Sequence, residues 1–208
     1  MSYVYEHPIP ARIMHHVHLV CIAVLAATGF YIHRPDFSIF GFDMNTVRSV
    51  HFVAAIVILL NSVSRIYWAF LGAPRDIRFF MPEKENKGKL LPMMAYYYFL
   101  RRTKPRTSKY NGWQKATYVL WTIAVWFMAL TGFAMLYKTA PVWAFVISLF
   151  GGLAMVHTIH YLVMWFFIFT TLFHIYLVLF EDFASFLKMF FGINNGKEEA
   201  IPASQDAA

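Results

Sequence analysis

The sequence predicts an all-α integral membrane protein, a bundle of four transmembrane helices with both termini in the cytoplasm. Three observations predict this fold: an apolar composition, four long apolar runs, and basic residues gathered between those runs. Of the 208 residues, 59% are hydrophobic, 19% are aromatic and only 14% are charged. A soluble core of this length could not bury so much apolar surface, which indicates that lipid is the solvent.

Four apolar runs are long enough to cross a hydrocarbon layer, which requires about 20 helical residues. They cover residues 13–32, 50–71, 116–136 and 156–180. No small-residue cleavage pattern follows the first run, so we interpret it as a retained helix and not as a signal peptide. A shorter run from Pro141, interrupted by Gly151 and Gly152, predicts an interfacial or re-entrant segment that leads into the fourth span.

The basic residues predict the orientation of these spans. The segment 72–115 is rich in Lys and Arg, whereas the connections 33–49 and 137–155 hold few of these residues. By the positive-inside rule the long basic loop is cytoplasmic, so four crossings put both termini on that side. The net charge of +7 is therefore a topology signal and does not indicate nucleic-acid binding. Within the loop, LLPMMAYYYFLRRTKP predicts a short helix at the lipid headgroups, with an ordinary loop as the alternative.

Residues 1–191 are expected to form one transmembrane domain, followed by a polar tail at 192–208 that we expect to be disordered. The first and third spans share a short echo, AVLAATGF ending at Phe30 and WFMALTGF ending at Phe133. We interpret this echo as small residues that let helices approach closely. The single cysteine, Cys21, lies inside the first span, which excludes a disulfide framework or a cysteine-ligated metal site within the chain.

Histidines lie at two depths of the predicted bundle, where polar side chains are costly and usually face a partner. They are His15, His16 and His18 at the inner end of the first span, His51 at the outer start of the second, and His157, His160 and His174 on the fourth. His160 and His174 are 14 residues apart, so one helix face presents two imidazoles about 21 Å apart along the axis, one in each leaflet.

This arrangement matches two stacked haems, since each iron would be held by imidazoles from two different helices. The predicted pairs are His15 with His174 at the inner haem iron and His51 with His160 at the outer haem iron. The alternates are His16, His18 and His157. The simpler interpretation of any single membrane histidine is a hydrogen bond between helices. No Cys-x-x-Cys-His motif is present, so the haems would be of b type, and two axial histidines suit an iron to electron transfer.

The first span, ARIMHHVHLVCIAVLAATGF, resembles the first helix of the b-type cytochrome subunits of membrane-bound nickel-iron hydrogenases and respiratory formate dehydrogenases. The pattern of that family is Arg-x-x-His-Trp before an apolar run that ends in Thr-Gly. Arg12 and His15 take the motif positions, and His16 stands where the family has tryptophan.

The second and fourth spans are similar to the hydrogenase branch of this family. The second span carries His51 and ends with RIYW from Arg65, and the fourth begins with His-x-x-His. Two positions depart from the pattern, because Tyr161 stands where arginine is common and Phe173 stands where glycine precedes the last histidine. The similarity covers residues 5–190.

The resemblance implies a membrane anchor and electron conduit in the prokaryotic cytoplasmic (inner) membrane. The catalytic large subunit of a partner hydrogenase would oxidise hydrogen, and electrons would pass through its iron–sulfur small subunit and two haems b to a quinone, ubiquinone or menaquinone. No catalytic residue is expected in this chain. Arg12, Arg48 and Arg65 are candidate partners of the haem propionates, with snorkelling to lipid phosphate as the alternative.

The segment KYNGWQK, residues 109–115, looks more like the formate dehydrogenase branch, where a similar run lines the quinone site. Asn111 and Gln114 are candidates to bind a quinone carbonyl, or they form a capping box at the start of the third span. The alternative partner is therefore a formate dehydrogenase or a related thiosulfate or molybdenum enzyme. A transporter that moves metal or protons by its membrane histidines is the alternative from another class.

Overall fold

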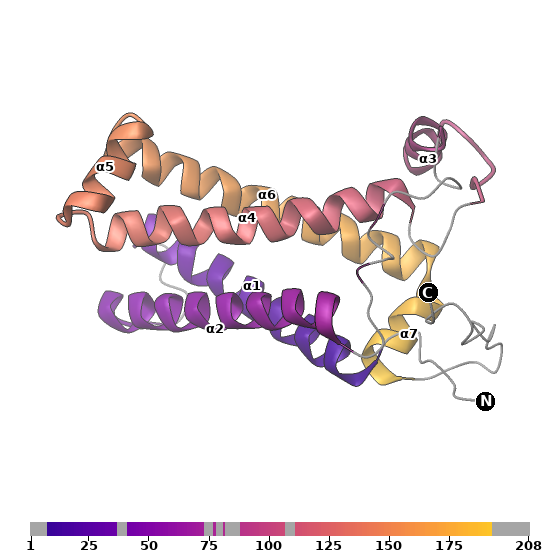
Figure 1. Ribbon diagram of the computed structural model, residues 1–208, viewed down its shortest axis with the longest axis horizontal. Coiled ribbons are helices and arrows are strands. Elements are labelled where there is room, and N and C mark those ends of the chain that lie inside the picture. Colours follow the sequence, from indigo (N-terminus) through magenta and orange to yellow (C-terminus); the bar gives the residue numbers. More distant parts are fainter. Residues whose placement is uncertain are drawn as a thin grey trace.

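The computed structural model describes residues 8–36, 41–72, 77, 81, 88–106 and 111–192. The helices in these ranges are α1 (Ile9–His33), α2 (Met44–Leu71), α3 (Leu90–Tyr97), α4 (Gly112–Leu136), α5 (Pro141–Leu149), α6 (Leu153–Glu181) and α7 (Phe183–Phe191). The four long helices run along the molecule; α3, α7 and the start of α1 lie at one end and α5 lies at the other (Figure 1). The tail predicted to be disordered lies outside the described residues from position 193 onward.

The predicted number of spans is confirmed for the described residues. Helices α1, α2, α4 and α6 have 25, 28, 25 and 29 residues and are long and apolar enough to cross a membrane. Helix α2 begins before its apolar run because the Asp43 side chain accepts hydrogen bonds from the backbone N–H groups of Asn45 and Thr46. A cap of this kind satisfies N–H groups that have no partner within the helix. Hydrogen bonds from Thr46 lower the pKa of the Asp43 carboxyl.

The two shorter apolar segments also form helices where the sequence suggested them. Helix α5 covers the run that begins at Pro141, and the chain then reverses at Gly151 and Gly152 to enter α6. These glycines have φ values of 85° and 110°, a backbone conformation that side chains with a Cβ rarely adopt. Helix α3 forms within the segment that was predicted to lie at the headgroups.

Helix α7 was not predicted as a separate element. The apolar pattern continues from the fourth span to Phe191, but α6 ends at Glu181 and Asp182 begins a new helix. The Asp182 carboxylate accepts hydrogen bonds from the backbone N–H of Ser185 at 3.2 Å and from its hydroxyl at 2.7 Å. This local cap therefore stops one helix and starts another where Glu181 and Asp182 interrupt the apolar run.

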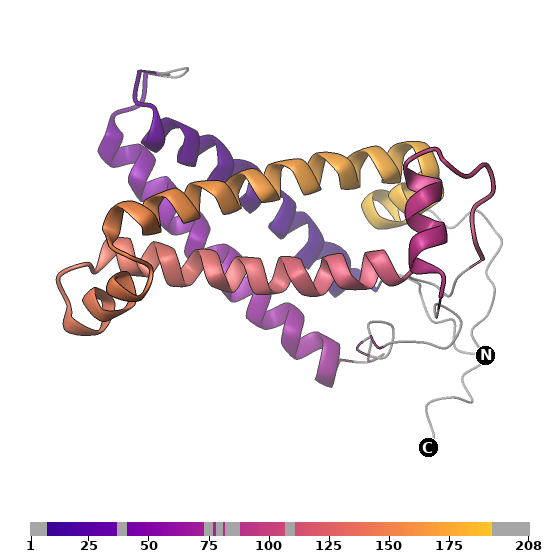
Figure 2. The same ribbon diagram turned by 90° about the horizontal axis from the view of Figure 1, so that it is seen from above.

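The four long helices share a small buried core and expose most of their apolar surface. Cys21, Ile58, Ala124, Val125 and Phe167 form one buried cluster. Large apolar side chains elsewhere on these helices face outward, as expected where lipid replaces water. Figure 2 shows that α1 and α2 lie together and cross α4 and α6 obliquely. The core lies where these two pairs of helices meet.

Candidate haem site

Two threonines contact the predicted outer ligands, His51 and His160, at the end of the bundle nearest α5. The Nδ1 atom of His51 on α2 lies 2.8 Å from the Oγ1 atom of Thr28 on α1. The Nδ1 atom of His160 on α6 lies 2.7 Å from the Oγ1 atom of Thr131 on α4. Each predicted outer ligand is thus engaged through the same ring nitrogen by a threonine of a neighbouring helix, which leaves Nε2 as the ring nitrogen for a metal.

A glycine follows each of these threonines and lies beside the same ring. A Cβ atom on Gly29 would lie 3.7 Å from Cε1 of His51, and one on Gly132 would lie 3.6 Å from Cε1 of His160. Cε1 adjoins the Nε2 atom on which a metal would bind. The two imidazoles, one from α2 and one from α6, are donors of the kind that hold haem iron.

The predicted inner ligands face each other across α1 and α6. The ring centres of His15 and His174 are 6.4 Å apart, with 55° between the ring planes. Two imidazoles that bind one metal ion through nitrogens about 2.0 Å from it have ring centres roughly 6 Å apart. Trp121 of α4 lies edge-on to His174, at 5.8 Å between ring centres. The spacing of the two histidine rings therefore fits one iron held from two helices.

The alternate histidines have other surroundings. The Nδ1 atom of His16 lies 2.6 Å from the carbonyl oxygen of Arg12, and its ring packs on Phe190 of α7 at 4.7 Å. His18 contacts Asn61 of α2 and lies 3.3 Å from the carbonyl oxygen of Met14. His157 is exposed at the start of α6. The contacts of His16 and His18 use Nδ1, as those of His51 and His160 do, so the choice of the four primary ligands over these three alternates stays a prediction.

The candidate propionate partners differ in position. Arg12 donates hydrogen bonds from Nε to the carbonyl oxygen of Met189 at 2.9 Å and from Nη2 to that of Phe190 at 3.1 Å. Arg48 is exposed near the start of α2, and Arg65 is partly buried near its other end. Arg12 thus joins the start of α1 to the end of α7, and pairing of the three arginines with propionates stays a prediction.

Asn111 and Gln114 form the capping box that the sequence allowed. The Asn111 side chain accepts from the backbone N–H of Gln114 at 3.0 Å, and the Gln114 side chain accepts from that of Asn111 at 2.9 Å. Asn111 also donates to the hydroxyl oxygen of Tyr97 on α3 at 2.7 Å and is only 3% exposed. Burial raises the pKa of Tyr97. The capping role is confirmed, and the quinone role stays a prediction.

Sequence reasoning missed the threonines that hold the outer histidines. The signal was present in the repeated Thr-Gly-Phe of the first and third spans, which we interpreted as helix-contact residues. Gly29 does serve helix contact, because a Cβ there would lie 3.0 Å from Sδ of Met164 on α6. The repeated Thr-Gly-Phe therefore contains both a residue for close helix packing and the hydrogen-bond partner of a histidine.

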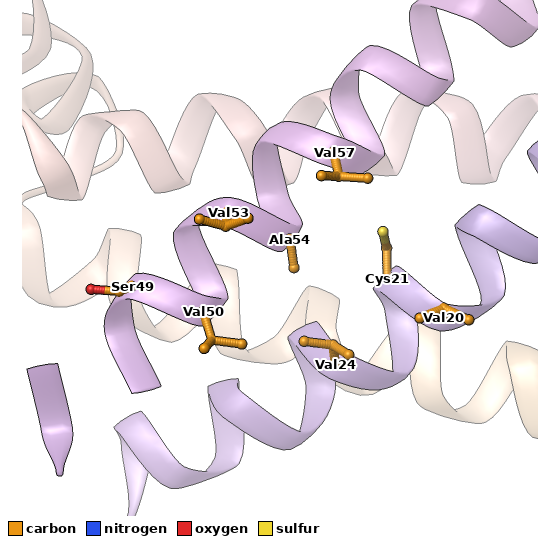
Figure 3. Close-up of a pocket in the computed structure, with 8 residues that line it drawn as sticks. All are labelled: Val20, Cys21, Val24, Ser49, Val50, Val53, Ala54 and Val57. Carbon is orange, nitrogen blue, oxygen red and sulfur yellow. The ribbon is translucent and has the colours of Figure 1, made fainter. Parts of the chain in front are cut away.

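A separate apolar groove lies between α1 and α2, with a volume of about 380 Å³. Figure 3 shows its lining residues, which are Val20, Cys21, Val24, Ser49, Val50, Val53, Ala54 and Val57. None of the histidines lines it, and Ser49 points away from its centre (Figure 3). This groove therefore forms no part of the histidine site.

A family model described as prokaryotic cytochrome b561 matches residues 6–192. The "Probable Ni/Fe-hydrogenase B-type cytochrome subunit" of Cupriavidus necator is 33% identical over 197 residues, covering 87% of this chain and 80% of the relative. The protein of that name from Azotobacter vinelandii is 32% identical over 88% of this chain and 82% of its own.

A third relative is the "Probable Ni/Fe-hydrogenase 1 B-type cytochrome subunit" of Escherichia coli K12. It is 30% identical over 200 residues, which cover 88% of this chain and 84% of the relative. The family match spans all four long helices and every histidine discussed above. The chain therefore belongs to the prokaryotic cytochrome b561 family, as a multi-pass membrane cytochrome of the b type, which carries haem b.

Proposed function

We propose that this chain is the membrane-anchoring dihaem subunit that passes electrons from a nickel-iron hydrogenase to the membrane quinone pool. The observation that carries the proposal is that α6 presents a histidine at each of two levels, the inner one facing a histidine of α1. His174 faces His15 at 6.4 Å between ring centres, and His160 is held by Thr131 as His51 is held by Thr28. The names of the relatives support a hydrogenase partner.

The four histidines would hold two haems b, one at each level. Bound haem iron alternates between its ferric and ferrous states and so supplies one-electron transfer. His51 and His160 would hold the outer haem iron, and His15 and His174 would hold the inner one. The buried cluster that includes Cys21 and Phe167 lies between the two levels along the helices.

The remaining assignments follow from this role. Both termini would lie in the cytoplasm, so the inner pair would face the cytoplasmic side of a prokaryotic inner membrane. Hydrogen oxidation would take place on the partner's large subunit, with its iron–sulfur subunit delivering electrons to the outer pair. A quinone would bind near the inner pair, and Asn111 and Gln114 stay candidates for its carbonyl, in competition with their capping bonds.

Hydrogen-dependent reduction of the cytochrome tests the proposal. Membranes that contain this chain and its native partners should show a b-type absorption that hydrogen reduces and an added quinone analogue reoxidises. Reduction by formate and not by hydrogen would favour the formate dehydrogenase alternative, which the segment 109–115 suggests. A purified chain without any dithionite-reducible b-type spectrum would contradict the cytochrome function and favour a transporter.

A further inference from the structure

We propose that Thr28 and Thr131 are positioning residues that fix the tautomer and ring orientation of His51 and His160 for the outer iron. This inference rests on the proposed function, because it assumes that these two histidines hold a haem. It adds two residues that do not touch the metal themselves and that act through a histidine of another helix.

The hydrogen bonds of each threonine give the direction of its contact with the imidazole. The Thr28 hydroxyl lies 2.7 Å from the carbonyl oxygen of Val24 and 3.2 Å from that of Leu25. A carbonyl oxygen only accepts, so the single hydroxyl proton points toward the backbone. The Oγ1 atom can then only accept from His51, which places the ring proton on Nδ1 and the lone pair on Nε2.

Thr131 repeats this arrangement on the other pair of helices. Its hydroxyl lies 3.0 Å from the carbonyl oxygen of Phe127 and 3.1 Å from that of Met128, and its Oγ1 lies 2.7 Å from Nδ1 of His160. Thr131 has an exposed fraction of 0%, so water cannot replace either bond. His160 is therefore held as the same tautomer as His51.

The repetition of the contact supports a ligand role over a purely structural hydrogen bond. A threonine in a membrane helix commonly bonds to its own backbone, and a contact with one histidine could serve helix packing alone. Here two threonines on different helices contact the same ring nitrogen, Nδ1, of the two predicted outer ligands. In both rings Nε2 is then the nitrogen left for a metal.

Removal of each hydroxyl tests the proposal in the purified cytochrome. Thr28→Val and Thr131→Val preserve the shape of the side chain but remove the acceptor, whereas Thr28→Ser and Thr131→Ser retain it. Thr122→Val is the matched control, because Thr122 of α4 bonds to the carbonyl oxygen of Tyr118 at 3.0 Å and is exposed. Haem content, reduction potentials and the electron paramagnetic resonance of each ferric haem are measured for every variant.

The valine variants should weaken retention of the outer haem about 10- to 100-fold, as expected when a partner of a metal-bound histidine is lost. The haem that remains at this site should be easier to reduce, because an imidazole without the Nδ1–H hydrogen bond is a weaker donor to ferric iron. The inner haem should keep its potential and spectrum, which shows that the variant is folded. The serine variants and Thr122→Val should match the wild type.

Valine variants with an unchanged outer haem would overturn the inference while leaving the proposed function intact. Valine variants that affect both haems equally, or serine variants that fail to restore the outer haem, would also overturn it, because they indicate a packing role. A wild-type protein without two b-type haems would instead contradict the proposed function. Haem content of the wild type is therefore measured first.

Discussion

Trp121 of α4 lies edge-on to His174 of α6, with 5.8 Å between ring centres and 68° between ring planes. Its indole N–H donates to the hydroxyl oxygen of Thr170, one turn before His174, at 3.0 Å. Thr170 in turn donates to the carbonyl oxygen of Phe166 at 2.7 Å. These two hydrogen bonds thus fix the indole ring of Trp121 beside His174, the predicted inner ligand.

Thr170→Val should disturb the inner haem and not the outer one. The change leaves the partly buried indole N–H of Trp121 without its acceptor, at a cost of about 1–3 kcal/mol. Thermal unfolding followed by haem absorbance should show this loss, and the ferric resonance signal of the inner haem should shift. Trp121→Phe, which has no N–H to satisfy, should cost less stability. Equal losses of thermal stability in the two variants would contradict the role of the hydrogen bond between Trp121 and Thr170.

Haem content should be about two haem b per polypeptide by pyridine haemochrome analysis, given two pairs of axial ligands. His51→Ala and His160→Ala should each remove one haem and leave the other with its spectrum. His157→Ala should retain both, because that side chain is exposed at the start of α6. Loss of the outer haem in the His157 variant alone would reverse the assignment.

Among the three histidines at the start of α1, only His15 is expected to be essential for the inner haem. His15→Ala should lose that haem because the ring across from His174 is removed. His16→Ala and His18→Ala should retain it, since the His16 ring packs on Phe190 and the His18 ring contacts Asn61, whereas His15 lies across from His174. Haem content and the reduction potentials of the retained haems distinguish the variants, and retention of both haems by the His15 variant would refute the pairing.

Arg12→Ala should release the end of α7 from the start of α1. The variant loses two hydrogen bonds to the carbonyl oxygens of Met189 and Phe190, which have few partners at a helix C-terminus. Hydrogen exchange should therefore increase across residues 183–191. An inner haem whose potential also shifts would support the additional pairing of Arg12 with a propionate. Unchanged exchange would mean that the aromatic packing of α7 is sufficient to hold it.

Asn111→Ala should destabilise the start of α4 by about 1 kcal/mol, the usual cost of losing an N-cap. If Asn111 also binds quinone, reoxidation of the haems by a soluble quinone analogue should slow while reduction by the partner stays normal. Asn111→Ser still caps but has no amide, so it separates the two roles. Full turnover in the Ala variant would exclude the quinone role.

The sequence alone determined the number and type of the long helices, because the length of an apolar run is set by the bilayer that it crosses. It also determined that His160 and His174 share a helix face, because helical periodicity relates residues of one helix without reference to any other. The capping box of Asn111 and Gln114 was predictable for the same reason, since both residues lie within one turn.

Tertiary structure decided every feature that depends on how two helices cross. His15 and His18 are three residues apart and share one side of α1, so only the packing of α6 selects His15 as the ring opposite His174. The bond between Thr28 and His51 joins two helices, so the repeated Thr-Gly-Phe in the sequence marks the threonine but does not identify its partner. Arg12 likewise meets Met189, 177 residues away, because α7 turns back across the end of the bundle.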